Sequence, residues 1–233
     1  MVDPGDAQPV HAALQKWGLQ LQTILVTHHH QDHTGGVRAL CAATQAVVYG
    51  PAKEAMPVPC RRLSGGDTLH SLGLTFEVLD VPGHTAGHIA FYAAQAVGAP
   101  LLFCGDTLFS AGCGRLLGGS PAQMLASLDK LAALPGNTRV CAAHEYTLGN
   151  LAFAAVVDGS NPHLPPWRAQ AQALRAQQLP TLPSTLATER NINPFLRTRH
   201  PALVQAAQLV DATASDEVSV FAALRHWKDM FKP

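Results

Sequence analysis

Short apolar runs, separated by polar clusters and by Gly or Pro, mark the first part of the chain. Their four to six residues, which are alternating or wholly apolar, are typical of half-buried and buried β-strands. The predicted strands are 21–26, 46–49, 74–78, 89–93, 101–104 and 139–143. A set of short strands, each followed by polar residues, predicts an α/β protein with a functional site at the strand ends.

Other segments repeat their apolar residues at helical spacing. Residues 9–17 and 37–43 predict two helices, whereas 53–62 has no clear period. Ser120-Pro121 begins a third helix, which Pro135-Gly136 ends. The predicted inner face of that helix consists of Met124, Leu125, Leu128, Leu131 and Leu134.

The composition changes after about residue 148. Ala, Gln, Arg and Pro dominate there, with helical periodicity and without internal repeats. The change predicts two domains, with strands in residues 1–147 and a smaller helical domain in 148–233.

A dense polar cluster, Thr27-His28-His29-His30-Gln31-Asp32-His33, follows the first predicted strand. In an extended segment, His28 and His30 point to one side and His29 to the other. Burying so many ionisable side chains unpaired is too costly for a packed core. Imidazole with carboxylate is a ligand set for zinc, iron or manganese. The alternative is a solvated histidine-rich loop or a tag remnant, which the internal position and the preceding strand disfavour.

Further residues with ligand chemistry lie past the ends of other predicted strands. With the first cluster they form the set His28, His30, Asp32, His33, His84, Asp106 and His144. Seven ligands exceed the three or four that one zinc ion uses. They suit two metal ions if one carboxylate bridges both.

Composition narrows the remaining classes of function. The 233 residues are 47% hydrophobic and 14% charged, enough for a substantial core, and the formal net charge is +0. We therefore expect no nucleic-acid or membrane partner. No apolar run reaches the roughly 18 residues that cross a bilayer, and the start lacks a signal-peptide pattern.

Five cysteines without Cys-x-x-Cys spacing predict reduced thiols and a cytoplasmic protein. Twelve histidines agree with metal chemistry.

The ligand clusters and several later motifs resemble the hydroxyacylglutathione hydrolase, or glyoxalase II, family of the metallo-β-lactamase superfamily. The first histidine motif identifies only the superfamily, and the later motifs favour the family. The similar segments are 27–33, 83–88, 105–109, 112–115, 144–147, 183–186, 193–195 and 225–229.

The resemblance implies a fold and a domain organisation. It implies an αββα sandwich in residues 1–147, the catalytic domain, and a helical substrate-binding domain in 148–233. The family has a β-hairpin ahead of the segment that starts here as Val2-Asp3-Pro4-Gly5. We therefore expect a sheet that lacks this N-terminal hairpin and has an uncovered edge.

The resemblance also implies roles for the ligand-type residues. His28, His30 and His84 would hold one metal ion, and Asp32, His33 and His144 the other. Asp106 would bridge both ions, and Asp32 and Asp106 would be the catalytic carboxylates. Two divalent ions are expected, zinc first, with iron or manganese as alternatives. His88 is interpreted as a supporting residue rather than a ligand, and Cys113 as a bystander.

The implied reaction is hydrolysis of S-D-lactoylglutathione to a 2-hydroxy acid and glutathione, the second step of methylglyoxal detoxification. Two metal ions about 3.5–4 Å apart hold a bridging water and lower its pKa towards about 7. The resulting hydroxide would attack the thioester carbonyl. A thiolate whose conjugate acid has a pKa near 8.5 leaves with little proton assistance.

Substrate recognition rests on fixed cations, because glutathione carries two carboxylates. The resemblance places Arg115, Tyr146, Arg225 and Lys228 around the substrate. A solvated helix face is the alternative for Arg225 and Lys228, which lie at i and i+3. The chain departs from the family at Leu117, where an aromatic residue is usual, and at Gly118, where Glu is common. The expected partner is the small-molecule thioester, bound by a monomer.

Two other functions remain open at this point. One is another binuclear hydrolase of the same superfamily, such as a lactonase or a β-lactamase. Asp106 disfavours a β-lactamase, which typically has Cys at the corresponding position. The other is a non-catalytic protein with structural metals, which would not need seven ligands with a shared carboxylate.

Overall fold

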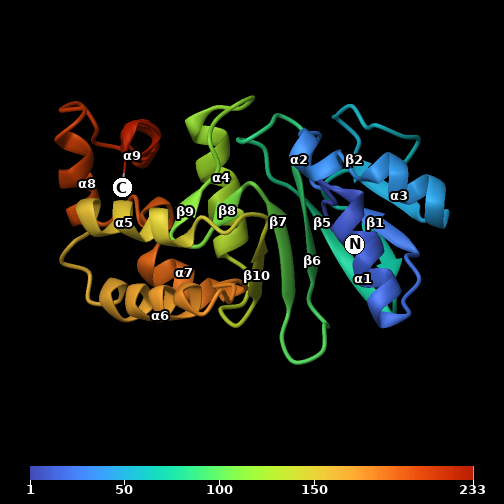
Figure 1. The fold of residues 1–233 in the computed structure, drawn as a ribbon. Helices are drawn as coiled ribbons and strands as arrows, with labels where there is room; N and C mark the ends of the chain where they lie inside the picture. The colour runs from blue at the N-terminus through green and yellow to red at the C-terminus, as the bar shows by residue number, and fades with distance from the viewer. Residues whose placement is uncertain (233) are drawn as a thin grey trace.

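Two facing β-sheets form the middle of the protein, and helices cover their outer faces (Figure 1). The structure is a computed structural model and describes residues 1–232. The smaller sheet is parallel and has the order β1-β2-β3, and the larger sheet has the order β11-β10-β7-β6-β5-β4. A two-stranded ribbon, β8-β9, lies apart from both.

The strand bounds agree with the sequence pattern for the strongly apolar segments. The smaller sheet comprises β1 Thr23–Leu25, β2 Val47–Pro51 and β3 Arg61–Leu63. The larger sheet comprises β4 Thr68–Ser71, β5 Leu74–Asp80, β6 Ile89–Ala93, β7 Leu101–Gly105, β10 Arg139–Ala142 and β11 Ser184–Thr185. The ribbon comprises β8 Leu108–Phe109 and β9 Gly112–Cys113. All six predicted strands are present, although β1 is shorter than the predicted 21–26.

Three helices before residue 148 lie close to the prediction: α1 Ala7–Trp17, α3 Val37–Thr44 and α4 Pro121–Ala132. The short helix α2 Gln31–Thr34 was not predicted. Helix α1 begins before the predicted residue 9 because the Asp6 side chain caps it, accepting a hydrogen bond from the Gln8 N–H. Ser120 and Gln123 form a reciprocal capping box at the start of α4.

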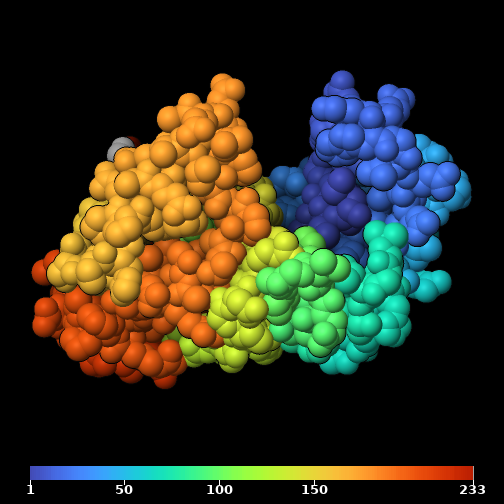
Figure 2. Space-filling model, turned by 90° about the horizontal axis from the view of Figure 1, so that it is seen from below, coloured from blue at the N-terminus to red at the C-terminus, as the bar shows by residue number. Residues whose placement is uncertain are grey.

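The helical C-terminal region follows. Its elements are α5 Thr147–Val157, α6 Leu164–Ala176, α7 Leu186–Ile192, the 3₁₀ helix η1 Pro194–Leu196, α8 Pro201–Gln208 and α9 Glu217–Met230. The space-filling view shows this region, in yellow to red, on the opposite side of the molecule from the blue N-terminal segment (Figure 2). None of the helices in residues 1–232 combines the length and apolar character needed to cross a membrane.

Three apolar clusters hold the layers together. One packs α1 and α3 on the smaller sheet through Val10, Ile24 and Leu40. A second fills the space between the two sheets, and its fully buried ring is Phe91. A third lies between α4, the larger sheet and the C-terminal helices. The αββα sandwich with a helical C-terminal region is therefore confirmed.

The third cluster spans the predicted domain boundary between residues 147 and 148. It combines Leu128 and Val140 from one side with Phe153, Leu203 and Phe221 from the other. In addition, β11 pairs with β10 and so completes the larger sheet. The boundary itself stays a prediction.

Candidate metal centre

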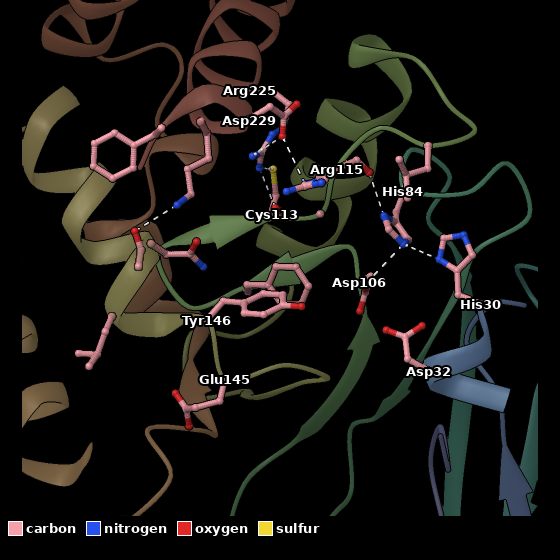
Figure 3. A pocket seen from close by; sticks show the side chains of 18 of the residues that line it. His30, Asp32, His84, Asp106, Cys113, Arg115, Glu145, Tyr146, Arg225 and Asp229 are labelled. Carbon is pink, nitrogen blue, oxygen red and sulfur yellow. Dashed lines mark hydrogen bonds and ion pairs between the residues drawn. The ribbon is translucent and has the colours of Figure 1, made fainter. Parts of the chain in front are cut away.

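The seven ligand candidates come from the loops that follow four strands. His28 and His30 follow β1, and the short helix α2 carries Asp32 and His33. His84 follows β5, Asp106 follows β7 and His144 follows β10. Figure 3 shows the side chains of His30, Asp32, His84 and Asp106 gathered at one side of a cavity. The sequence-predicted set is thus brought together in space.

His28, His30 and His84 form the first ligand group. Their ring nitrogens lie within 4.8 Å of one another. His30 Nδ1 lies 3.1 Å from His28 Nε2 and 3.0 Å from His84 Nε2. His28 and His84 are buried, and His30 is partly exposed.

Asp32, His33 and His144 form the second ligand group. The Nε2 atoms of His33 and His144 lie 3.2 Å apart, and Asp32 Oδ2 lies 3.4 Å from His144 Nε2. His33 is buried, His144 is partly exposed, and the Asp32 side chain is 61% exposed towards the cavity.

Asp106 lies between the two groups. Its Oδ1 lies 3.2 Å from His33 Nε2 and 3.3 Å from His144 Nε2, while its Oδ2 lies 3.5 Å from His84 Nε2. Asp106 Oδ1 is buried and has no hydrogen bond of good geometry among the described residues. Each oxygen of this carboxylate therefore faces a different ligand group.

The electrostatics of the cluster require positive charge beside Asp106. Burial alone would raise the pKa of Asp106, yet the His144 and His33 rings, whose Nε2 atoms lie 3.3 and 3.2 Å from its Oδ1, hold that pKa below its usual range. Burial opposes the charged form of His33, but its contacts with Asp106 and Asp3 raise its pKa to about 10. In the first group, burial and the neighbouring His88 lower the pKa of His28, so its ring is neutral.

The donor set fits two divalent cations. Within each ligand group, ring nitrogens lie 3.0–3.2 Å apart, so their lone pairs converge on one point in the middle of the group. This convergence is unfavourable unless a proton or a cation lies between the nitrogens. Neutral imidazoles with a shared carboxylate are suitable ligands for zinc, iron or manganese. A cation at each point would also supply the charge that the Asp106 carboxylate needs.

Several residues hold the ligands in place, and sequence reasoning did not assign all of them. Asp3 accepts hydrogen bonds from the Thr27 N–H and hydroxyl and lies 3.1 Å from His33 Nδ1. The backbone carbonyl of Arg115 accepts a hydrogen bond from His84 Nδ1 at 2.9 Å. Neither contact has a local sequence signal, because each partner lies 24 or more residues away.

His88 packs against two of the ligand candidates, His28 and Asp106. Its ring stacks on His28 with centroids 4.6 Å apart, and its Nε2 accepts a hydrogen bond from the Asp106 N–H at 3.2 Å. Gly105 allows this approach, because it has φ 48° and a Cβ there would lie 2.7 Å from His88 Nε2. Burial lowers the pKa of His88 to about 3, so the ring is neutral and Nε2 is free to accept. His88 belongs to neither ligand group.

A cavity of about 1090 Å³ extends from the centre to the C-terminal helices. Its wall includes the four predicted substrate contacts, Arg115, Tyr146, Arg225 and Lys228. Figure 3 labels the first three of them. The Arg115 side chain is 72% exposed and its Nε lies 3.8 Å from Asp229. The Tyr146 ring stacks on His144, with centroids 5.0 Å apart.

Arg225 and Lys228 lie in different environments on α9. The Arg225 guanidinium is buried, donates to the Cys113 carbonyl and Asp229, and lies over the Phe195 ring. Its Nε is buried without a partner among the described residues. Lys228 Nζ donates to the Gly149 carbonyl at 3.1 Å. A solvated helix face, the alternative for this pair, is therefore wrong for Arg225.

The cysteines do not add a nucleophile. Cys113 lines the cavity, but burial raises the pKa of its thiol to about 11 despite the nearby Arg225. Cys104 is fully buried in β7, and burial raises the pKa of its thiol further. Both thiols are protonated at neutral pH, as the interpretation of Cys113 as a bystander requires.

Comparisons with known proteins agree with this geometry. Residues 1–144 match the family model of the metallo-β-lactamase superfamily, and 145–231 match that of the hydroxyacylglutathione hydrolase C-terminus. A hydroxyacylglutathione hydrolase of Albidiferax ferrireducens is 67% identical over 231 residues, 99% of this chain and 91% of the relative. One of Cupriavidus taiwanensis is 54% identical over 241 residues, 100% of this chain and 91% of the relative.

Solved structures show the same fold. TTHA1623 in a di-iron-bound form is 31% identical, with a TM-score of 0.60, over 83% of this chain and 87% of that one. The B3 metallo-β-lactamase BLEG-1 is 26% identical, with a TM-score of 0.62, over 83% of this chain and 86% of that one. Together with the histidine and aspartate cluster, these similarities indicate a dinuclear metal site.

Proposed function

Because the chain belongs to the hydroxyacylglutathione hydrolase family of the metallo-β-lactamase superfamily, we propose that it hydrolyses S-2-hydroxyacylglutathione thioesters to a 2-hydroxy acid and glutathione. S-D-lactoylglutathione is the expected principal substrate. The main structural support for this proposal is the position of Asp106 between two ligand groups. These groups lie beside a cavity whose wall contains cationic side chains.

The proposed centre holds two divalent ions, and zinc is the metal we propose, with iron or manganese as alternatives. The first ligand group would hold one ion, and the second ligand group would hold the other. Asp106 would contribute to both sites. When bound, the ions supply Lewis acidity, which polarises a carbonyl group and lowers the pKa of water to about 7.

The chain's own residues supply orientation. Asp32 faces the cavity, so its carboxylate is suited to align the attacking water and to accept its proton. The leaving thiolate of glutathione has a conjugate acid with a pKa near 8.5 and needs no dedicated proton donor. The buried thiols of Cys104 and Cys113 take no part.

The glutathione carboxylates would bind at the C-terminal side of the cavity. Arg115 is exposed there, and Lys228 Nζ has one hydrogen-bond partner among the described residues and two further protons to donate. Arg225 also lines this wall, but its guanidinium lies deeper and its Nε is buried without a partner among the described residues. Charge-assisted hydrogen bonds from these groups suit a carboxylate better than a neutral lactone or acyl group.

A substrate comparison tests the proposal. We expect purified protein with two bound ions to hydrolyse S-D-lactoylglutathione with kcat/KM at least a hundredfold above that for lactones or β-lactams, because each of the latter lacks the glutathione carboxylates. Metal analysis of the same preparation should give close to two ions per chain. Comparable kcat/KM values for a lactone would favour the alternative, a lactonase.

We also propose a monomer in the cytoplasm whose partner is the small-molecule thioester. The five cysteines are free in the described structure, which fits a reducing compartment. Light scattering during gel filtration tests the oligomeric state, and a mass near 24.6 kDa is expected.

A further inference from the structure

Glu54 has a set of contacts that the proposed chemistry does not use. It follows β2 in a turn, and its side chain is only 4% exposed although it is charged and lies outside the ligand groups. Arg62 donates to the backbone carbonyls of Pro51 and Glu54, which fixes the turn. A buried carboxylate is costly unless hydrogen bonds compensate it, so its partners indicate its role.

Each oxygen of Glu54 binds a different loop. Oε2 accepts from the His29 N–H at 2.6 Å and lies 2.8 Å from His29 Nδ1. Oε1 accepts from the Gly87 N–H at 3.1 Å and from the Thr85 hydroxyl. Four donors meet the two oxygens of one side chain that, when ionised, only accepts.

The two loops that Glu54 joins carry the whole first ligand group. His29 stands between His28 and His30, and Thr85 directly follows His84. The residues of the second ligand group make no contact with Glu54 among its hydrogen bonds; His33 is held by Asp3 instead. The contacts of Glu54 are therefore confined to one of the two groups.

The fit around the carboxylate is close. A Cβ at Gly87 would lie 2.5 Å from Glu54 Cγ and 3.2 Å from its Oε1, so the loop reaches the carboxylate only because residue 87 is glycine. A Gln side chain at position 54 could accept hydrogen bonds from only one of the two loops. Gln has a single acceptor oxygen, and its NH₂ group would face donors of the other loop.

We infer that Glu54 is a positioning residue that fixes the first ligand group by holding both of its loops with one carboxylate. This inference rests on the binuclear centre of the proposed function. Outer contacts of this kind typically change metal affinity or activity by 10–100-fold. Loss of Glu54 should therefore weaken one metal site and spare the other.

The test is a titration of metal-free protein with Zn²⁺ in competition with a chromophoric chelator. The parent should bind two equivalents tightly. Glu54→Gln should bind one equivalent as the parent does and the other about 10–100-fold more weakly. Asp158→Asn is the matched control, since Asp158 is a buried carboxylate that binds Asn161 and Arg197 far from the ligand loops. It should bind both equivalents like the parent.

A kinetic measurement separates positioning from general damage. At limiting Zn²⁺ the Glu54→Gln variant should lose kcat, excess Zn²⁺ should restore it, and KM for S-D-lactoylglutathione should stay at the parental value. Parental affinity for both equivalents in Glu54→Gln would overturn the inference, as would equal weakening of both. If this variant does not fold, Thr85→Val decides: about tenfold weaker binding of one equivalent is expected, and unchanged binding overturns the inference.

Failure of the proposed function gives a different result. A parent that binds only one equivalent contradicts the binuclear centre, whatever Glu54 does. The affinity for that single ion should then fall in Glu54→Gln if His30→Ala, in the first ligand group, also lowers it, and should stay parental if His30→Ala does not; the opposite result overturns the inference. It should not fall in Asp158→Asn.

Discussion

At the scale of single residues, the two oxygens of Asp106 face different ligand groups, with Oδ1 3.2 Å from His33 Nε2 and Oδ2 3.5 Å from His84 Nε2. No other ligand candidate has this position. Asp106→Ala should therefore lose at least one bound ion and lower kcat more than about a hundredfold, beyond the 10–100-fold typical of outer contacts. Metal analysis and steady-state kinetics measure both. Asp129→Ala, at a surface ion pair with Arg199, is the control, and equal losses in the two variants would contradict the bridging position.

Lys228 separates substrate binding from chemistry. It lies in the cavity wall away from the ligand groups, so the contact proposed for it with a glutathione carboxylate would be the same before and during the reaction. A charge-assisted hydrogen bond contributes about 1.5–3 kcal/mol, and tenfold in affinity is about 1.4 kcal/mol. Lys228→Ala should raise KM for S-D-lactoylglutathione roughly 10–100-fold and leave kcat largely unchanged. A parental KM would remove Lys228 from the binding site.

Arg225→Ala is expected to behave differently, because the guanidinium is buried. Its loss removes the hydrogen bond to the Cys113 carbonyl and opens space over the Phe195 ring. This variant should therefore lose thermal stability as well as affinity.

The titration of Lys228 predicts a pH dependence. Burial, with the neighbouring Arg225, lowers the pKa of Lys228 to about 8, whereas Asp229 and Cys113 act in the opposite direction. Above pH 8 the free enzyme therefore loses the Lys228 charge that a carboxylate needs. We expect kcat/KM, which reports the free enzyme, to fall as the pH rises through about 8. In Lys228→Arg the charge persists at this pH, so the fall should disappear; a fall retained there would have another origin.

At the scale of elements, the sequence pattern predicts strands that bury several apolar side chains and overlooks those that do not. All six predicted strands are present, including β6 with its predicted bounds. The overlooked strands β3, β4, β8, β9 and β11 have two to four residues each. In β4, Leu69 alone is buried, so no alternation is visible. Partners distant in sequence, rather than local preference, stabilise such strands.

The β8–β9 ribbon illustrates that dependence, because the C-terminal region holds it. Asn193 Nδ2 donates to the carbonyls of Phe109 and Gly112, and Glu189 accepts from the Ala111 N–H in the turn between them. These partners lie 78 or more residues further along the chain. The C-terminal region, through α7 and the Asn193 that follows it, therefore helps to hold the ribbon.

Asn193→Ala should destabilise the protein through this ribbon. It removes the two buried hydrogen bonds that Asn193 Nδ2 donates to these carbonyls, each contributing about 0.5–1.5 kcal/mol. We expect a loss of about 2 kcal/mol, or roughly 4–8 °C in Tm for a chain of this size. Thermal denaturation of metal-free protein measures it. Asn191→Ala, with an exposed side chain, is the control, and a similar Tm for both variants would contradict the argument.

At the scale of the whole molecule, one apolar cluster joins α4 and the larger sheet to the C-terminal helices. Regions that share a core and a sheet are expected to unfold together. Calorimetry of metal-free protein should therefore give one transition with equal calorimetric and van't Hoff enthalpies. Two separable transitions would show that residues 1–147 and 148–233 are independent folding units.

The sequence predicts the centre of the site better than its surroundings. The seven ligand candidates share two local signals, their residue type and their position after a predicted strand, and they lie together in the structure. Asp3 and Glu54 carry neither signal, since their roles arise from contacts 24–33 residues away along the chain. Arg115 was predicted as a side-chain contact, whereas its carbonyl contact with His84 is invisible in any sequence.

The two contacts of Arg115 are made by different parts of the residue. Its exposed guanidinium faces the cavity, while its main-chain oxygen orients His84. Every amino acid provides that oxygen, so the histidine keeps its partner whichever side chain occupies the position. If Arg115 contacts substrate as proposed, substrate preference can thus diverge at residue 115, in evolution or in a designed library, while the proposed metal ligand His84 keeps its orientation.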